Sequence, residues 1–245
     1  MRLFGLIGYP LSHSFSKKYF SEKFEKENLT DCRYETFSIP SISDLSSILK
    51  DNPGLCGLNV TIPYKEQVLS FLDTKSDLVN KISSCNCIKI QGGKLAGYNT
   101  DAPAFQQSLK EKLQPHHTKA LILGTGGSAK AVEFSLRRMK ISFKHVSRKP
   151  SAKNFSYEQL TDELMQEYTL IINATPLGMY PNIVEAPQIP YHALTSKHYL
   201  FDLIYNPPKT LFLQKGEEGG AAVKNGYEML VLQAEESWRI WNQNE

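Results

Sequence analysis

The sequence predicts an α/β protein with two domains. Short apolar runs alternate with segments whose apolar residues repeat at helical spacing, which is the pattern of strands connected by helices in a mostly parallel sheet. The alternation stops at a polar segment, residues 115–118, and then begins again. A chain of 245 residues is long enough for two domains of modest size.

The first half of the chain should form a sheet covered by helices. Its predicted strands are at residues 3–7, 33–39, 55–61, 85–90 and 95–98, and the last two form a hairpin. Its predicted helices are one that contains Phe20 and Phe24, one at 43–49, one at 64–72, and one through Phe105, Leu109 and Leu113. Ser14 and Ser16 are candidate caps of the first helix, and Asp101 is a candidate cap of the last.

The second half repeats the alternation. Residues 120–123 form a continuous apolar run, as expected for a central parallel strand that is covered on both faces. Further strands are predicted at 142–146, 170–172 and 199–204, and helices at 128–139 and 227–241.

The composition excludes several classes of protein. The net charge of +3 is too small to indicate binding to nucleic acid or a membrane surface. Every apolar run is far shorter than the roughly 20 residues of a membrane helix. The apolar stretch at residues 3–7 is also too short for a signal peptide, so none is expected.

The cysteines and histidines indicate neither a disulfide framework nor a metal site. Free thiols in a reducing cytoplasm are expected at Cys32, Cys56, Cys85 and Cys87. Metal binding is not expected, because the chain has no second Cys or His pair at a plausible spacing. His116 and His117 follow Pro115 and are expected to lie in a solvated connection.

A glycine-rich segment joins the strand at 120–123 to the helix that follows. It reads Gly124, Thr125, Gly126, Gly127, Ser128 and Ala129, which matches the dinucleotide fingerprint in its G-x-G-x-x-A form. In such a loop the first glycine permits a tight turn, and the second lets backbone N–H groups approach a pyrophosphate at the helix N-terminus. The segment therefore predicts a Rossmann-like nucleotide-binding domain.

The end of the next strand indicates which nucleotide is bound. A site for NAD usually has an acidic residue there, which binds the ribose 2′-hydroxyl. This chain instead has Ser147, Arg148 and Lys149, and a guanidinium matches phosphate geometry. NADP is therefore favoured over NAD.

The first half contains polar residues that suit a hydroxylated substrate and a carbonyl–alcohol interconversion. They are Ser14, Ser16, Asn59, Thr61, Lys65, Asn86 and Asp101. If residues 64–72 are helical, Lys65 lies in the first turn, where the positive end of the helix dipole disfavours a cation. That placement makes Lys65 a candidate for proton transfer.

Motifs spread along the whole chain resemble those of the shikimate dehydrogenase family. Residues 57–65 match G-x-N-V-T-x-P-[YF]-K without a mismatch, and residues 97–101 match G-x-N-T-D. The other matching positions, in the family's order, are residues 8–16, Asn86, and residues 124–131, 172–179, 202–207 and 229–234.

The resemblance implies an activity and a substrate site. The activity is the reversible reduction of 3-dehydroshikimate to shikimate with NADPH, a step toward chorismate and the aromatic amino acids. Lys65 and Asp101 would form the proton-transferring pair. Ser14, Ser16 and Tyr205 would hold the substrate carboxylate. The remaining expected substrate-binding residues are Asn59, Thr61, Asn86 and Gln233, with Asp101 also bonding the ring hydroxyls.

It also implies the cofactor site and the domain boundaries. Gly124, Gly126 and Gly127 would face the pyrophosphate, Arg148 the 2′-phosphate, and Gly178 and Met179 the nicotinamide. The other expected cofactor-binding residues are Thr125, Ser128, Ala129, Ser147, Lys149, Thr175 and Gly226. Residues 1–101 with 226–245 would form the substrate domain, with the C-terminal helix packed back on it, and residues 102–225 the NADP-binding domain.

The sequence departs from the family pattern at a few positions. Lys17 replaces a proline, Ala104 and Glu228 replace glycines, and Ser147-Arg148-Lys149 replaces N-R-T. The last change leaves the strength of the NADP preference open. Two alternative functions also stay open: a broader quinate/shikimate dehydrogenase that uses NAD, and a nucleotide- or shikimate-binding sensor without catalysis. We expect small-molecule partners and a monomer or homodimer.

Overall fold

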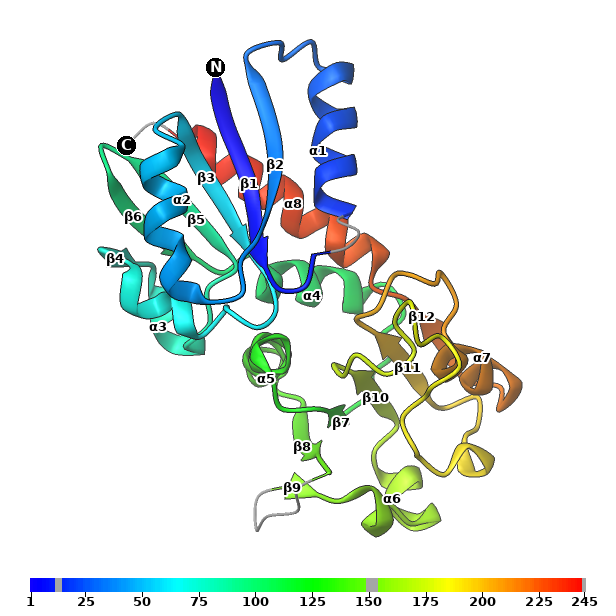
Figure 1. Cartoon of the computed structure of the whole chain (residues 1–245). Helices are drawn as coiled ribbons and strands as arrows, with labels where there is room; N and C mark the ends of the chain where they lie inside the picture. Colours follow the sequence, from blue (N-terminus) through cyan, green and yellow to red (C-terminus); the bar gives the residue numbers. More distant parts are fainter. Residues whose placement is uncertain (12–14, 149–153, 244–245) are drawn as a thin grey trace. The chain divides into compact units, whose positions relative to one another are not determined.

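The computed structural model describes residues 1–11, 15–148 and 154–243 (Figure 1). The chain forms two compact units: unit 1 contains Met1–Thr100 and Ala234–Glu245, and unit 2 contains Asp101–Gln233. Each unit is built on its own six-stranded sheet. The predicted fold class, α/β with two domains, is confirmed.

Unit 1 is a mixed sheet with helices on both faces. Its strands are β1 (Arg2–Gly8), β2 (Cys32–Ser38), β3 (Leu55–Val60), β4 (Thr74–Lys75), β5 (Cys87–Gln91) and β6 (Lys94–Tyr98). Its helices are α1 (Phe15–Lys26), α2 (Leu45–Asp51), α3 (Asp77–Ile82), the C-terminal part of α8 (Tyr227–Asn242), and the 3-10 helices Ile42–Asp44 and Gln67–Phe71. The strand order is β2-β1-β3-β5-β6-β4, with β1 parallel to both neighbours and β5 antiparallel to both of its own.

The two faces of this sheet carry separate apolar cores, because successive side chains of a strand point to opposite faces. On one face Ile7 of β1 packs with Leu45 of α2. On the other face Phe4 of β1 packs with Phe20 of α1 and Trp241 of α8. α2 and α8 accordingly lie on opposite faces of the sheet (Figure 1). The prediction that the C-terminal helix packs on the substrate domain is confirmed.

Unit 2 is an all-parallel sheet. Its strands are β7 (Lys119–Leu123), β8 (Ser142–Val146), β9 (Asn154–Phe155), β10 (Leu170–Asn173), β11 (Tyr199–Asp202) and β12 (Ala222–Lys224). Its helices are α4 (Asp101–Lys110), α5 (Gly127–Arg138), α6 (Asp162–Glu167), α7 (Leu211–Glu218), the first part of α8, and the 3-10 helices Tyr157–Gln159 and Tyr191–Ala193. The sheet order is β12-β11-β10-β7-β8-β9, and every neighbouring pair is parallel.

This strand order is the doubly wound order of a Rossmann fold. The first strand of the unit, β7, lies between the second, β8, and the fourth, β10, so the winding reverses between β7 and β10. Phe105 of α4 and Val132 of α5 cover one face of the sheet. Met165 of α6 and Phe212 of α7 cover the other. In such sheets ligands bind at the carboxyl ends of the strands where the winding reverses.

The predicted elements differ from the structure mainly where segments are short. The helix predicted at residues 64–72 is wrong: turns lead into the 3-10 helix Gln67–Phe71. α3, α6 and α7 were not predicted; α3 and α6 have six residues each, and α7 has eight. Six residues make fewer than two helical turns, too few for an apolar periodicity to be recognised.

The connection between α4 and β7 also differs from expectation at one residue. His117 was expected to be solvated, and that is wrong, because its side chain is buried. Its Nδ1 accepts a hydrogen bond from the N–H of Gln114 at 2.9 Å, and its Nε2 lies 3.0 Å from the carbonyl oxygen of Lys197. Burial lowers the pKa of His117. His116 is exposed, as predicted.

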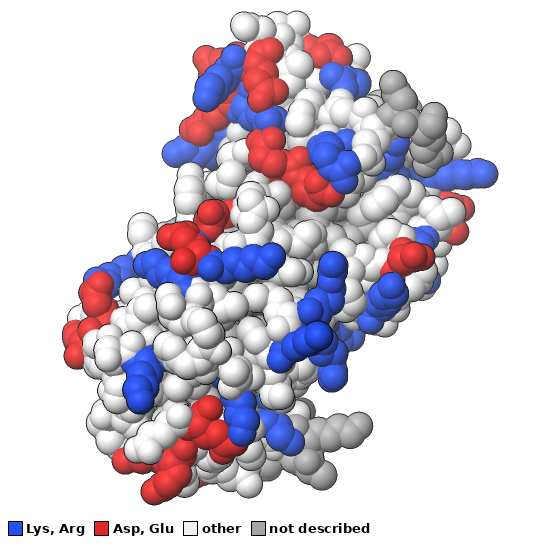
Figure 2. Space-filling model, turned by 180° about the vertical axis from the view of Figure 1, so that it is seen from behind, with Lys and Arg blue, Asp and Glu red and all other residues white. Residues whose placement is uncertain are grey.

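The described helices are all too short or too polar to cross a membrane. On the face shown in Figure 2, basic and acidic side chains occur in small groups separated by uncharged residues.

Candidate active site

The expected substrate residues of unit 1 lie at one end of its sheet. Asn59 is the penultimate residue of β3, and Thr61 follows that strand. The N–H of Thr61 donates to the carbonyl of Ile7 in β1 at 2.9 Å. The N–H of Val60 donates to the carbonyl of Asn86, also at 2.9 Å, so the segment before β5 is joined to the end of β3.

The amide of Asn59 is buried and fully engaged within unit 1. Its Oδ1 accepts a hydrogen bond from the Tyr34 hydroxyl at 2.8 Å. Its Nδ2 donates to Ser237 Oγ at 2.9 Å and to the carbonyl of Asn86 at 3.3 Å. Both amide hydrogens of Asn59 are therefore used inside the protein.

Asn86 is fixed by the segment that precedes Asp101. Its Nδ2 donates to Thr100 Oγ1 at 2.8 Å, and its Oδ1 accepts from the N–H of Thr100 at 2.7 Å. This reciprocal pair holds the Asn86 amide in one orientation. Asp101 is the next residue along the chain and is buried. It is the first residue of α4 rather than its cap, so the expected cap is not found there.

Lys65 lies in a turn and is half-buried. The carbonyl of Lys65 accepts a hydrogen bond from the N–H of Cys85 at 2.8 Å, which places its backbone beside the segment that carries Asn86. Tyr64 anchors the same turn, since its hydroxyl donates to the carbonyl of Ile39 at 2.5 Å. Lys65 lies before the 3-10 helix Gln67–Phe71, so its predicted position in the first turn of a helix is wrong.

The expected serine pair is only partly described. Ser14 lies outside the described residues. Ser16 is inside α1 rather than at its cap, and it is hydrogen-bonded to the Tyr34 hydroxyl. Burial raises the pKa of Tyr34 well above its ordinary value, so Tyr34 stays protonated and can donate to Asn59.

Neither Tyr34 nor Ser237 was selected from the sequence. Both are buried members of the network that connects Ser16, Asn59 and Asn86. Ser237 also lies 3.4 Å from Thr100 Oγ1. A tyrosine in a strand and a serine in the last helix carry no sequence signal for such a role.

Two expected substrate residues belong to unit 2. Tyr205 is half-buried in the loop after β11. Gln233 is buried in α8, and its Nε2 donates to the carbonyl of Leu230 at 2.9 Å.

The glycine-rich loop lies where the winding of unit 2 reverses. Gly124 has φ +106°, a conformation that side chains disfavour. A Cβ at Gly124 would lie 3.1 Å from Thr175 Cγ2 and 3.2 Å from the carbonyl oxygen of Ala174. The loops after β7 and β10 therefore approach each other at this glycine.

The loop fits a pyrophosphate. Gly126 is the N-cap of α5, and a Cβ built on it would meet no described atom within 4 Å. The first N–H groups of a helix have no partner inside the helix, and the dipole favours an anion there. Thr125 is exposed, Gly127 and Ser128 begin the helix, and Ala129 is buried against the sheet. Open space thus adjoins the positive end of the helix.

The residues expected at the 2′-phosphate follow β8. The N–H of Ser147 donates to the carbonyl of Phe155 at 2.9 Å. Arg148 is exposed, and its charge partly opposes the rise in the pKa of Tyr157 that burial causes. Lys149 lies outside the described residues.

The loop that carries Gly178 and Met179 is held by a buried carboxylate. Asp202 accepts hydrogen bonds from Asn173 Nδ2 at 3.0 Å, the N–H of Ile204 at 3.0 Å and Thr210 Oγ1 at 2.6 Å. Asn173 Oδ1 in turn accepts from the N–H and the hydroxyl of Thr175. Burial raises the pKa of Asp202 to about 7, although these hydrogen bonds lower it.

The remaining expected cofactor residues have distinct surroundings. Gly178 has φ +94°, and a Cβ there would lie 2.9 Å from the carbonyl oxygen of Glu185. Met179 is 43% exposed. At Gly226 a Cβ would lie 2.2 Å from the carbonyl oxygen of Leu203, so close packing by itself accounts for this glycine. The described residues contain no group of three or more His, Cys, Asp or Glu side chains that could hold a metal ion.

Comparison with known proteins identifies relatives of this chain. Residues 6–88 match the model of the shikimate dehydrogenase substrate binding domain. The shikimate dehydrogenase (NADP(+)) of Caldicellulosiruptor saccharolyticus is 34% identical over 258 residues, which cover 98% of this chain and 92% of the relative.

Solved structures are similar over both units. Shikimate 5-dehydrogenase from Thermus thermophilus, in complex with NADP(H) and shikimate, is 30% identical with a TM-score of 0.87, covering 99% of this chain and 94% of that one. Shikimate 5-dehydrogenase from Listeria monocytogenes, in complex with shikimate and NAD, is 26% identical with a TM-score of 0.83, covering 100% and 93%. The chain belongs to the shikimate dehydrogenase family.

Proposed function

We propose that this protein catalyses the reversible reduction of 3-dehydroshikimate to shikimate with NADPH. The proposal rests on the identity to shikimate dehydrogenases along almost the whole chain. The observation that carries it is the buried network of unit 1, in which Asn86 and Thr100 bond each other twice and Asn59 is held beside them. Such a network presents polar groups in a single arrangement, which recognition of a hydroxylated ring requires.

In this proposal Lys65 and Asp101 move the proton. Bound NADPH supplies the hydride that reduces the C3 carbonyl carbon of the substrate. Lys65 donates a proton to the carbonyl oxygen, so that ketone, hydride and proton give the alcohol, and in the reverse direction it accepts that proton. Asp101 orients Lys65 and shares its proton. Asp101 is joined to Thr100, so their Cα atoms are about 3.8 Å apart and the Asn86–Thr100 bonds restrain its position.

The substrate-binding residues divide into two kinds. Ser14, Ser16 and Tyr205 are proposed to bind the carboxylate, and Thr61, Asn86, Asp101 and Gln233 the hydroxyls. For Asn59 we propose a positioning role, because both of its amide hydrogens are used within unit 1.

The proposed cofactor is NADP rather than NAD. The support is the exposed Arg148 after β8, where the sequence has no carboxylate for a ribose 2′-hydroxyl. The Listeria relative was solved with NAD, so the preference has to be measured. Equal kcat/KM with NADPH and NADH would contradict it.

We place the enzyme in the cytoplasm, since its four cysteines are free thiols, and propose a monomer or homodimer.

The proposed activity is tested by measuring, from the absorbance of NADPH, how fast NADPH forms from NADP and shikimate. Robust turnover of quinate with NAD would favour the broader dehydrogenase. A folded protein that binds shikimate and NADP without turnover would support the sensor.

The role of Lys65 can be tested by substitution. Lys65→Ala should lower kcat by about 10²–10⁴ while the KM for shikimate changes little, because general acid–base help is removed. Lys75→Ala, which removes an exposed lysine of β4, is the matched control and should have normal kinetics. A large rise in KM at unchanged kcat would make Lys65 a binding residue instead.

A further inference from the structure

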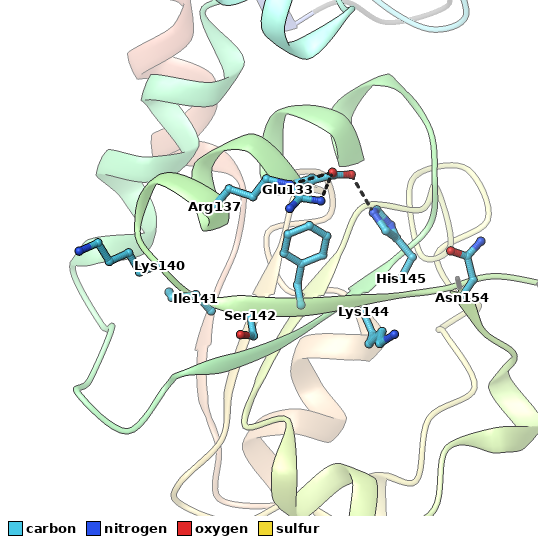
Figure 3. A pocket seen from close by; sticks show the side chains of 9 residues that line it. Glu133, Arg137, Lys140, Ile141, Ser142, Lys144, His145 and Asn154 are labelled. Atoms are coloured by element: carbon cyan, nitrogen blue, oxygen red, sulfur yellow. Dashed lines mark hydrogen bonds and ion pairs between the residues drawn. The ribbon is translucent and has the colours of Figure 1, made fainter. Parts of the chain in front are cut away.

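A histidine on β8 contacts the glycine-rich loop from its protein side. His145 Nδ1 lies 2.9 Å from the carbonyl oxygen of Gly124, and its Nε2 lies 3.2 Å from Glu133 Oε2 on α5. Figure 3 shows the imidazole between the strand and the helix, pointing toward Glu133. His145 was not selected from the sequence, and it belongs to neither the proposed substrate set nor the proposed cofactor set.

The chemistry of the two partners defines how the ring is held. A carbonyl oxygen and a carboxylate are both acceptors, so the Nδ1–H tautomer of the ring donates to Gly124 and the Nε2–H tautomer donates to Glu133. Glu133 is itself held by Arg137, whose Nε and Nη2 donate to Oε1 at 3.1 and 2.9 Å. His145, Glu133 and Arg137 line a surface pocket together with Lys140 and Lys144, whose side chains point away from the ring (Figure 3).

These contacts fix both backbone groups of Gly124. Its N–H donates to the carbonyl of Val146 at 2.9 Å, and its carbonyl faces His145. The peptide bond between Gly124 and Thr125 is trans, so the N–H of Thr125 points opposite to that carbonyl. It therefore points away from His145.

We propose that His145, held by Glu133, is a positioning residue that orients the Thr125 N–H toward the phosphates of the dinucleotide. This inference rests on the proposed use of NADP(H), and it adds a residue that touches neither cofactor nor substrate. An N–H group that the protein already holds in place loses little conformational entropy when the anion binds. The same group in an unrestrained loop loses more, which weakens binding.

The test uses variants that separate the two hydrogen bonds of the ring. His145→Phe keeps a ring and removes both bonds. His145→Asn keeps an amide near the position of Nδ1 and so retains the bond to Gly124. Glu133→Gln keeps an acceptor beside Nε2 but removes the charge. Lys144→Ala changes a neighbouring side chain on β8 that points away and serves as the control.

Two measurements test the positioning role of His145 without catalytic turnover. The Kd of NADPH from fluorescence titration should rise about tenfold in His145→Phe, but less than threefold in His145→Asn, Glu133→Gln and the control. In cofactor-free protein, amide hydrogen exchange at residues 125–127 should be faster in His145→Phe than in wild type. The KM for shikimate should be unchanged.

The possible failures are distinct. A wild-type protein that does not bind NADPH would overturn the proposed cofactor, while the exchange measurement would still report on the loop. An unchanged Kd and unchanged exchange in a folded His145→Phe would overturn the positioning role. A His145→Asn variant as weak as His145→Phe would show that the bond to Gly124 is not the one that matters, which also overturns it.

Discussion

Gly124 and Gly126 lie two residues apart in one loop, but their surroundings differ. Gly124 has a positive φ, and an added Cβ would meet Thr175 and Ala174. Gly126 has an ordinary φ of −79°, and an added Cβ would meet open space. The first glycine is needed by the backbone of the loop itself. At the second, no described atom would meet a side chain, so space is left there for a ligand.

Alanine at these two positions should therefore have different effects. Gly126→Ala should lower the thermal midpoint only slightly, because alanine is a poorer N-cap than glycine. It should raise the Kd of NADPH about tenfold, because the methyl group occupies space meant for a phosphate. Gly124→Ala should in addition lower the free energy of unfolding by roughly 1–2 kcal/mol, because alanine is strained at positive φ. Normal NADPH binding by Gly126→Ala would mean that the pyrophosphate does not lie at this helix end.

At the scale of elements, the end of α8 depends on a glycine in β3. The indole Nε1 of Trp241 donates to the carbonyl of Ile88 at 2.9 Å. The ring lies so close to Gly57 that a Cβ there would be 2.4 Å from Nε1. Gly57 belongs to the family motif that runs through Lys65, but packing of the last helix explains it without reference to substrate.

Gly57→Ala should destabilise unit 1 by about 1–3 kcal/mol, because the methyl group overpacks the sheet against Trp241. Chemical denaturation followed by tryptophan fluorescence should detect the loss, since Trp238 and Trp241 both lie in the unit 1 core. In the double variant Gly57→Ala, Trp241→Leu the cost should be smaller than the sum of the single costs. Additive costs would show that the two groups do not clash.

At the scale of the whole molecule, two buried groups of unit 2 make stability depend on pH with opposite signs. Burial lowers the pKa of His117 and raises that of Asp202 to about 7. For His117 the unfolded chain binds the proton more readily, so the contribution of this residue is lost as the pH falls below about 6.5. For Asp202 the folded chain binds the proton more readily, so stability is lost as the pH rises from about 4 to 7.

Asp202→Asn should remove the loss of stability that Asp202 causes as the pH rises. Asparagine resembles the protonated carboxyl: its oxygen can accept from Asn173 and Ile204, and its NH₂ can donate to Thr210. The stability of the variant relative to wild type should increase between pH 4 and pH 8, by at most roughly 4 kcal/mol for a shift of this size. Circular dichroism should be used, because both tryptophans are in unit 1. A difference that does not vary with pH would contradict the raised pKa.

His117→Asn should remove the loss of stability that His117 causes as the pH falls. The amide oxygen of asparagine can still accept a hydrogen bond from the N–H of Gln114, so the substitution mainly removes the titratable imidazole. The stability advantage of wild type over this variant should be larger at pH 7.5 than at pH 5. Parallel curves from pH 5 to 7.5 would mean that His117 titrates normally in the folded chain.

Much of the fold could be predicted because its signals are local. The apolar run at β7, the glycines after it and the periodicity of α5 lie within twenty residues and identify the nucleotide-binding unit. The elements that were missed or misjudged, such as α3, α6 and the turn at Lys65, are short and depend on neighbours for their stability.

The sequence by itself determined the fold class, the family resemblance and the residues proposed to carry the chemistry. The tertiary structure decided how those residues are held. Tyr34, Asn59 and Ser237 form one hydrogen-bonded chain, although Ser237 is 178 positions from Asn59. His145 reaches Gly124 across 21 positions and Glu133 across 12. A side chain's hydrogen-bond partner is chosen by folding, which brings distant groups together and excludes the water that would otherwise bind them.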